Sequence, residues 1–263
     1  MLLKIEDLDV SFRDDSGAVT RAARGVDLEL DRGEVLGVVG ESGSGKSSVA
    51  MSVARLLPSP PAFWPKGRIL FDGEDILAMP VEKLRDIRGR RIGVVFQDPM
   101  GSLSPLRRIG DQLAETVLLH ERVSSRSAAE TAREWLGKVA LRDPAAVARA
   151  YPHELSGGMQ QRVMIAMALM LGPDLLIADE PTTALDVTVQ AQVLKLMNEL
   201  KGANSAVMLI THDLGVVSSM ATKVAVMREG RVVEKNSSVA GFFADPVHEY
   251  SRALVAEARK MEL

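Results

Sequence analysis

The spacing of apolar and polar residues changes along the chain, and it predicts strands that alternate with helices. Residues 3–8 and 26–30 have apolar side chains at every second position, which is typical of half-buried strands. Residues 35–39 and 92–96 are short, nearly continuous apolar runs, the pattern of strands buried on both faces. Between these strands, the spacing predicts a helix at about residues 46–57.

A different pattern occupies about residues 99–154. Apolar residues there recur at helical spacing among many Ala, Arg and Glu residues, and they predict helices at residues 109–120, 127–140 and 145–150. Further strands are predicted at residues 68–71, 175–178, 206–210 and 224–227. The fold class that follows is α/β: a largely parallel sheet covered by helices, with an antiparallel β edge and an inserted α-helical subdomain, all within a single domain of residues 1–263.

The composition narrows the possible functions. The chain has 263 residues, of which 32 are Lys or Arg and 35 are Asp or Glu. This slight acidic excess and the lack of a long basic run argue against a nucleic-acid partner. The absence of cysteine excludes disulfides, thiolate zinc sites and iron–sulfur clusters. No apolar stretch has the roughly 18–20 residues of a membrane span, and the N-terminal residues lack the apolar core of a signal peptide. We therefore expect a soluble, cytoplasmic protein that would reach a membrane only through a partner.

A Gly-rich loop lies between a predicted buried strand and a predicted helix. Its residues, GESGSGKS, match the phosphate-binding pattern GxxxxGK[ST]. The glycines let backbone N–H groups converge on phosphates at a helix N-terminus, Lys46 adds a positive charge, and we expect the Ser47 hydroxyl to ligate Mg²⁺. A flexible turn is the simpler alternative, but the strand–loop–helix position favours a phosphate site. The residues expected to contact ATP here are Gly40, Glu41, Ser42, Gly43, Ser44, Gly45, Lys46, Ser47 and Ser48.

Two carboxylates follow another buried strand, in the run LLIADE. The carboxyl end of a parallel strand opens onto the ligand crevice of such a sheet. We expect Asp179 to hold the Mg²⁺ shell and Glu180 to polarise a water for in-line attack on the γ-phosphate. A solvated acidic strand end is the alternative; the presence of the phosphate loop in the same chain favours the catalytic interpretation.

The run LSGGMQQR, which begins at Leu155, is a second turn that opens a helix, with a hydroxyl and bare backbone N–H groups suited to an anion. Here the chain resembles the ATP-binding-cassette (ABC) ATPase family, whose signature is LSGGQ. The resemblance implies a P-loop NTPase (RecA-like) core, with Ser156, Gly157, Gly158 and Met159 facing ATP bound by a neighbouring copy. Met159 stands where many members have Gln, but LSGGMQQR is common in the peptide and nickel importer branch.

Three more residues match family positions, in family order. The resemblance implies that Gln97 touches Mg²⁺ and water, that Asp186 crosses the dimer interface and binds ATP in trans, and that His212 contacts the γ-phosphate. Taken alone, each is better explained as a cap or a turn residue, but together and in family order they favour the functional interpretation. The implied catalytic set is Glu180, His212, Gln97 and Lys46, and the implied Mg²⁺ ligands are Ser47, Gln97 and Asp179.

One position is ambiguous. Phe12 lies near the place where the family stacks an aromatic ring on adenine, but a core Phe fits the sequence nearly as well.

The resemblance covers about residues 2–250. The segments QDPM at residues 97–100, YPHELS at residues 151–156 and residues 180–192, and a tail with Asp245, Pro246 and His248, look like the dipeptide, oligopeptide and nickel importer branch. It implies a motor subunit that binds and hydrolyses ATP on the cytoplasmic face of the inner (plasma) membrane. Its implied partners are a second ABC ATPase subunit, identical or homologous, two transmembrane permease subunits and, indirectly, a solute-binding protein.

The substrate expected from this branch is a peptide or a nickel or other metal chelate. Many peptide-importing members carry a further Cys-rich segment, and the lack of Cys here favours the nickel or chelate members slightly. A cassette of a soluble carbon–phosphorus lyase-type complex is the main alternative function. A DNA-repair or ribosome-associated ABC protein is a second alternative, disfavoured because the chain has neither a coiled-coil insertion nor tandem cassettes.

Overall fold

The computed structural model describes residues 1–182 and 185–261. The chain forms two compact units. The first consists of Met1–Leu84 together with Ala206–Leu263, and the second of Arg85–Ser205. Thr183 and Ala184, in the loop that leads to Asp186, lie outside the described residues.

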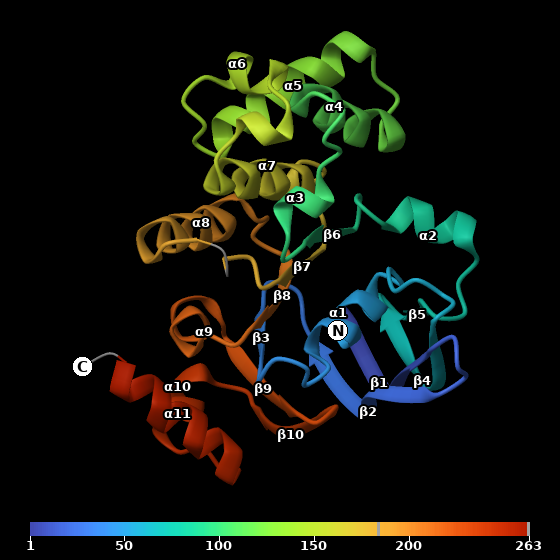
Figure 1. Ribbon diagram of the computed structural model, residues 1–263, viewed down its shortest axis with the longest axis vertical. Coiled ribbons are helices and arrows are strands. Elements are labelled where there is room, and N and C mark those ends of the chain that lie inside the picture. The colour runs from blue at the N-terminus through green and yellow to red at the C-terminus, as the bar shows by residue number, and fades with distance from the viewer. Residues whose placement is uncertain (183–184, 262–263) are drawn as a thin grey trace. The chain divides into compact units, whose positions relative to one another are not determined.

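The first unit contains an antiparallel sheet with the strand order β2-β1-β4-β5 and a second group of strands in the order β10-β9-β3-β8. Figure 1 shows helices beside both groups. The strands of this unit are β1 (Leu3–Arg13), β2 (Val19–Leu30), β3 (Val35–Val39), β4 (Ala62–Phe71), β5 (Glu74–Asp75), β8 (Ala206–Thr211), β9 (Lys223–Arg228) and β10 (Arg231–Asn236). Its helices are α1 (Lys46–Val53), α9 (Leu214–Met220), α10 (Val239–Ala244) and α11 (Glu249–Met261). The helix α2 (Val81–Ile87) begins in this unit and ends in the second.

Apolar runs account for the parallel strands of this unit. Every residue of β3 and of β8 is buried, as the continuous apolar sequences predict for strands covered on both faces. β3 pairs in parallel with β8 on one side and with β9 on the other. The α/β fold class with a parallel sheet and a separate antiparallel edge is therefore confirmed.

The antiparallel strands are longer than the alternation of residues predicts. The pattern predicts strands at residues 3–8, 26–30 and 68–71, whereas β1, β2 and β4 have 11, 12 and 10 residues. β1 lies between the other two strands and pairs with both, so backbone hydrogen bonds continue the ladder past the alternating residues. Pro65, which cannot donate to a ladder, falls where the register between β1 and β4 shifts.

The helix after the Gly-rich loop is shorter than predicted. The spacing predicts residues 46–57, but α1 ends at Val53. Arg55 has a left-handed backbone conformation with φ 50°, and its guanidinium donates to the carbonyl oxygen of Met79 at 2.7 Å. Local backbone bonds, from the N–H of Arg55 to the Ser52 carbonyl and from that of Leu56 to the Met51 carbonyl, end the helix before the first proline.

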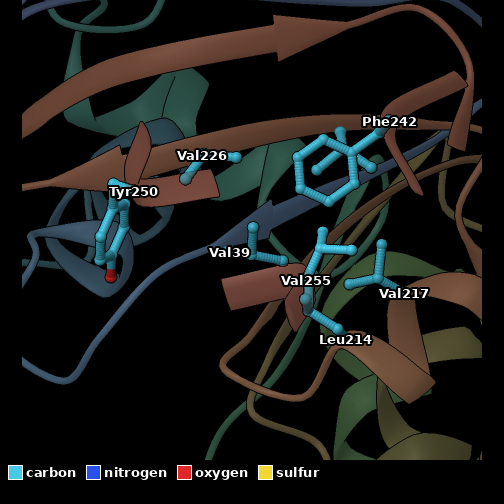
Figure 2. Close-up of a cluster of buried hydrophobic side chains, with 8 residues drawn as sticks. Val39, Leu214, Val217, Val226, Phe242, Tyr250 and Val255 are labelled. Carbon is cyan, nitrogen blue, oxygen red and sulfur yellow. The ribbon is translucent and has the colours of Figure 1, made fainter. Parts of the chain in front are cut away.

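Three C-terminal helices bury an apolar cluster against β3 and β9. Figure 2 shows part of this cluster, in which Phe242 of α10 is fully buried. Burial of one such side chain contributes about 1.5–3 kcal/mol. The cluster therefore attaches the last helices of the described chain firmly to the strands. Its buried members are Val39, Leu214, Val217, Val224, Val226, Phe242, Tyr250 and Val255.

The second unit is mainly helical. α4, α5 and α6 pack against one another, α4 and α5 pack on α7, and α7 packs on β6 and α8 (Figure 1). The predicted helices at 109–120, 127–140 and 145–150 correspond to α4, α5 and α6, with small shifts at the ends of the last two. Its elements are β6 (Ile92–Val95), α3 (Pro99–Ser102), α4 (Ile109–His120), α5 (Ser125–Lys138), α6 (Pro144–Arg149), a 3₁₀ turn (Pro152–Glu154), α7 (Gly157–Leu169), β7 (Leu175–Asp179) and α8 (Val187–Leu200).

Side-chain caps mark the start of several helices of this unit. Ser124 accepts a hydrogen bond from the backbone N–H of Ser127, and Asp143 accepts one from that of Ala146. Each cap satisfies an N–H group that has no partner inside its helix. None of the helices described here combines the length and the apolar character that a bilayer span requires.

Glu234 of β10 attaches the start of α11 to the sheet. Glu234 is 8% exposed, and its carboxylate accepts hydrogen bonds from the backbone N–H groups of Val247, at 3.0 Å, and His248, at 2.8 Å. Burial alone would raise the pKa of Glu234, but the nearby Ser251 hydroxyl and the hydrogen bonds from these two N–H groups outweigh it and lower the pKa below its ordinary value.

Replacement of this carboxylate yields a pH-dependent prediction. Because the folded-state pKa is depressed, the stabilisation is present above the unfolded value of about 4.3 and is lost as pH falls through the folded pKa. We expect Glu234→Gln to lower the free energy of unfolding by about 1–3 kcal/mol at pH 7, and by less as the pH falls below about 4. Urea denaturation at several pH values measures this difference.

Glu229→Gln is the matched control, because the Glu229 side chain is 83% exposed and pairs only at the surface with Arg228. It should change the free energy of unfolding by less than about 0.5 kcal/mol. A loss for Glu234→Gln that stays constant across the pH range would contradict the assigned role of the carboxylate.

Candidate functional site

The Gly-rich loop leaves β3 and enters α1, and Lys46 lies inside it. The Lys46 ammonium donates to the carbonyl oxygens of Gly40 and Glu41, each at 2.8 Å, and to the Ser44 hydroxyl at 3.3 Å. Lys46 is only 4% exposed, and a buried charge needs such polar contacts. These hydrogen bonds hold the backbone of residues 40–44 in one conformation around the ammonium group. Ser42, Gly43 and Ser47 are exposed, and Ser48 lies half-buried in the first turn of α1.

Two neighbouring segments support the loop from outside. The turn between β9 and β10 contains Glu229 and Gly230, both with positive φ, and the Gly230 N–H donates to the Ser44 carbonyl at 3.1 Å. Gly45, with φ 95°, lies against β2, where an added Cβ would come within 2.1 Å of the Ala22 carbonyl oxygen. Gly45 is also the N-cap of α1 and offers no side-chain cap. The positive end of the helix dipole therefore faces the loop, as in an anion site.

His212 is brought next to this loop by the pairing of parallel strands. Val39, the last residue of β3, is opposite Thr211, the last residue of β8, so Gly40 and His212 leave the sheet at the same level. His212 is exposed, while the Asp213 carboxylate caps α9 by accepting from the N–H of Gly215 at 2.8 Å. A cavity of about 440 Å³ lies here, and Gly40, Glu41, His212 and the α11 residues Leu254, Glu257 and Ala258 are among those that line it.

In the second unit the same arrangement brings Gln97 and Glu180 together. Val95 of β6 is opposite Ala178 of β7, and two residues later the Gln97 amide donates to a Glu180 carboxylate oxygen at 3.1 Å. Glu180 has φ 45°, a left-handed conformation that is uncommon for a residue with a side chain. Asp179, immediately before it, is 6% exposed at the end of the strand. Strain of this kind at a strand end is typical of functional sites.

The predicted second anion site is an exposed turn at the start of α7. Ser156 caps this helix by accepting from the Met159 N–H at 3.4 Å, and Ser156 and Gly157 are exposed while Gly158 and Met159 are half-buried. Asp186 caps α8 in the same way, accepting from the Val189 N–H at 3.0 Å. Both residues thus have the capping role that sequence alone allowed, at helix ends that present positive dipoles to solvent.

Ser47 of the first unit has a hydroxyl oxygen, and Asp179 and Gln97 of the second unit have a carboxylate and an amide oxygen. Hard oxygen ligands of this kind suit Mg²⁺. Within the described part of the chain, no three His, Cys, Asp or Glu side chains gather into a metal site.

Phe12 is half-buried near the end of β1, opposite Thr20 and Ala62, in the same unit as the loop. Its place in the sheet is compatible both with stacking on adenine and with packing in the core.

Sequence reasoning missed a different residue, Tyr250 of α11, whose hydroxyl accepts a hydrogen bond from the Glu41 N–H at 3.0 Å. The sequence signal for Tyr250 is only that of a buried aromatic residue on an amphipathic helix.

Known proteins resemble this chain in sequence and in fold. A family profile described as "ABC transporter" matches residues 23–183. The oligopeptide transport ATP-binding protein of Bacillus subtilis is 47% identical over 99% of this chain and 73% of its own length. A probable peptide ABC transporter ATP-binding protein of Sinorhizobium fredii is 51% identical over 97% of this chain and 76% of its own. Among solved structures, a dimeric ATP-binding cassette in a post-hydrolysis state, bound to ADP and Pi, has a TM-score of 0.78 at 27% identity, covering 89% of this chain and 98% of its own.

The contact between Gly45 and β2 yields a prediction about the stability of the loop. Gly43 and Gly45 both have positive φ, but an added Cβ meets nothing within 4 Å at Gly43 and a backbone oxygen at 2.1 Å at Gly45. Gly43→Ala should therefore cost only the conformational penalty of about 1–2 kcal/mol. Gly45→Ala should cost clearly more, because a backbone segment must move. Chemical denaturation of the two variants measures the difference, and equal losses would contradict the close contact with Ala22.

Proposed function

The chain belongs to the ABC transporter family as an ATP-binding and ATP-hydrolysing subunit, and on that basis we propose that it drives the import of peptides through separate permease subunits. The observation that carries the hydrolytic part of the proposal is the contact between Gln97 and Glu180 at the end of paired parallel strands. It places a carboxylate and an amide together beside a strained backbone, as an ATPase needs to orient a water.

We assign the chemical steps to residues as follows. Glu180 accepts a proton from water as the water oxygen attacks the γ-phosphorus, and the bond to the bridging oxygen breaks with its electrons passing to ADP. Gln97 orients this water, and His212 contacts the γ-phosphate. Lys46 compensates the charge of the phosphates from within the loop, where its ammonium already lies among carbonyl oxygens.

Residues 40–48 would hold the phosphates of ATP. Support comes from the position of the loop at the N-terminus of α1 and from its backbone, which Lys46, Gly230 and Ala22 hold in place. Phe12 is the proposed stacking partner of adenine. Ser47, Gln97 and Asp179 are the proposed ligands of Mg²⁺, which, when bound, neutralises charge on the phosphate oxygens.

We further propose that two cassettes close over two ATP molecules. The turn at Ser156–Met159 and the side chain of Asp186 would then contact ATP held by the partner cassette. Support comes from the exposure of Ser156, Gly157 and Asp186 at helix N-termini, and from the dimeric cassette with ADP and Pi that resembles this chain. ATP would act as an interface ligand, so that hydrolysis removes contacts of the closed state.

The helical subdomain at about residues 99–154 is the proposed receiver of the permease. Gln97 precedes it and the turn at Ser156 follows it, so a partner bound there would be connected to both halves of the ATP site. Two apolar side chains near its start, Met100 and Leu106, are 59% and 87% exposed, as expected of a surface that a partner covers. The chain would thus lie on the cytoplasmic face of the membrane, with a solute-binding protein acting through the permeases.

The proposed substrate is a peptide, because the relatives reported above are named for peptide and oligopeptide transport. This reverses the slight preference for nickel or chelates drawn from the lack of cysteine. Permease and binding protein contact the substrate, so uptake of labelled peptides and of nickel by the assembled transporter distinguishes the two. Association with a soluble carbon–phosphorus lyase-type complex is not favoured by any of these observations.

Replacement of Glu180 tests the catalytic proposal. Glu180→Gln removes the proton acceptor but keeps the shape of the side chain and a hydrogen-bonding partner for Gln97. We expect nucleotide affinity to stay within a few-fold of the unmodified chain, turnover to fall at least about 100-fold, and a closed dimer with ATP to accumulate. Steady-state ATP hydrolysis and size-exclusion chromatography measure these effects.

Lys46→Ala is the contrasting variant, since it removes charge from the phosphate loop and should weaken ATP binding itself in a direct titration. Hydrolysis by Glu180→Gln within a few-fold of the unmodified chain would overturn the role of Glu180.

Crosslinking tests the proposed permease contact. The chain contains no cysteine, so Leu106→Cys introduces a single thiol at an exposed position of the helical subdomain. In the transporter purified from membranes, a short bifunctional reagent should link this thiol to a membrane subunit. Ala18→Cys, in the exposed turn between β1 and β2, is the control and should not crosslink. Links from Leu106→Cys to a soluble enzyme alone would contradict the importer assignment while leaving the ATPase assignment intact.

A further inference from the structure

Tyr250 connects the C-terminal helix to the phosphate loop. It lies in the first turn of α11, is 7% exposed, and belongs to the apolar cluster under β3 and β9. Figure 2 shows it at the side of the cluster, apart from Phe242 and Val255. Its hydroxyl oxygen accepts a hydrogen bond from the Glu41 N–H at 3.0 Å. The ring of Tyr250 therefore packs in the core, while its hydroxyl binds the backbone of the phosphate loop that surrounds Lys46.

Neighbouring groups fix the position of this ring. The Tyr250 N–H donates to Nδ1 of His248 at 3.1 Å, and the N–H of His248 donates to the Glu234 carboxylate. The Arg228 guanidinium lies over the ring, 5.0 Å from its centre. Burial is the main cause that raises the pKa of the Tyr250 hydroxyl, so it stays protonated and neutral at physiological pH. The ring is thus held by β9, by β10 and by its own helix.

The hydroxyl and the Lys46 ammonium hold opposite edges of one peptide unit. The Gly40 carbonyl, which accepts from Lys46, and the Glu41 N–H, which donates to Tyr250, belong to the same planar peptide. In a trans peptide these two groups point in opposite directions, so contacts at both edges prevent the plane from rotating about its two neighbouring bonds. If the hydroxyl is removed, the plane can turn, and the carbonyl that helps to place Lys46 turns with it.

We propose that Tyr250 is a positioning residue for the phosphate loop, acting through the Gly40–Glu41 peptide and Lys46 and contacting no nucleotide itself. The proposal rests on the proposed function of the loop as the ATP site. It gives α11 a role in nucleotide affinity beyond packing, and it makes the attachment of α11 at Glu234 part of the support of the ATP site. The cavity described above, with one wall from α11 and another from Gly40 and Glu41, lies along the same contact.

Tyr250→Phe tests this role, because it removes the hydroxyl and keeps the ring in the cluster. Glu41 is exposed, so water can replace the hydroxyl as an acceptor and the folded state should lose little stability. We expect the Kd for ATP, titrated with the full-length chain in the presence of Mg²⁺, to rise about three- to tenfold, the effect of one lost hydrogen bond on a preorganised loop. The maximal rate of hydrolysis at saturating ATP should stay within about twofold, and the Tm should be nearly unchanged.

Val255→Ala is the matched control on the same helix. It removes apolar contacts from the cluster but leaves the hydroxyl in place. We expect the opposite combination, a lowered Tm with an ATP affinity close to that of the unmodified chain. Affinity that falls in both variants in proportion to their loss of Tm would show that Tyr250 acts only by packing, and would overturn the proposal. So would an unchanged affinity in Tyr250→Phe.

Hydrogen exchange without nucleotide separates this proposal from the proposed function. The peptide that contains Glu41 should exchange its amide hydrogens several-fold faster in Tyr250→Phe than in the unmodified chain or in Val255→Ala. If the unmodified chain binds no ATP, the proposed function fails, yet this comparison still tests the contact at the loop. Equal exchange in Tyr250→Phe and the unmodified chain would overturn the positioning role even where ATP binds normally.

Discussion

Val39 lies opposite Thr211 in one unit and Val95 opposite Ala178 in the other, and this register of parallel strands places the chemical groups. The residues that follow each pair leave their strands at the same level, which brings Gly40 beside His212 and Gln97 beside Glu180. A slip of one residue would separate each pair and turn every side chain of the strand to the other face. Because these strands are buried on both faces, their apolar packing enforces the register, and the chemistry depends on it.

The phosphate loop, by contrast, depends on backbone groups and on what surrounds them. Its carbonyl oxygens receive the buried ammonium of Lys46, and segments far away in sequence, at Ala22, Gly230 and Tyr250, contact it from outside. A loop that is held in one shape before a ligand arrives loses less conformational freedom on binding. The strained backbone of Glu180, at the end of β7, likewise fixes the direction of its side chain before a ligand arrives.

The turns at Ser156 and Asp186 complement these rigid elements. Each residue caps a long helix, α7 or α8, so its side chain is already held by its own backbone while the positive end of the helix faces solvent. Such ends favour an anion, but nothing in the described chain closes over them. An ATP-dependent dimer, as proposed for this family member, would use both sets of groups at once, and the loss of one phosphate would weaken the contact between the two chains.

Local patterns in the sequence determined the alternation of strands and helices, the helices α4, α5 and α6 and the two glycine-rich turns, because spacing and turn chemistry act over a few residues. Tertiary structure decided the rest. Pairing with neighbouring strands extends β1, β2 and β4 beyond their alternating residues, and the Arg55 side chain beyond the end of α1 reaches the distant carbonyl of Met79. Tyr250 meets Glu41 across 209 residues of chain. The sequence marks it only as a buried aromatic, because which distant backbone group its hydroxyl reaches is set by how α11 packs on the sheet.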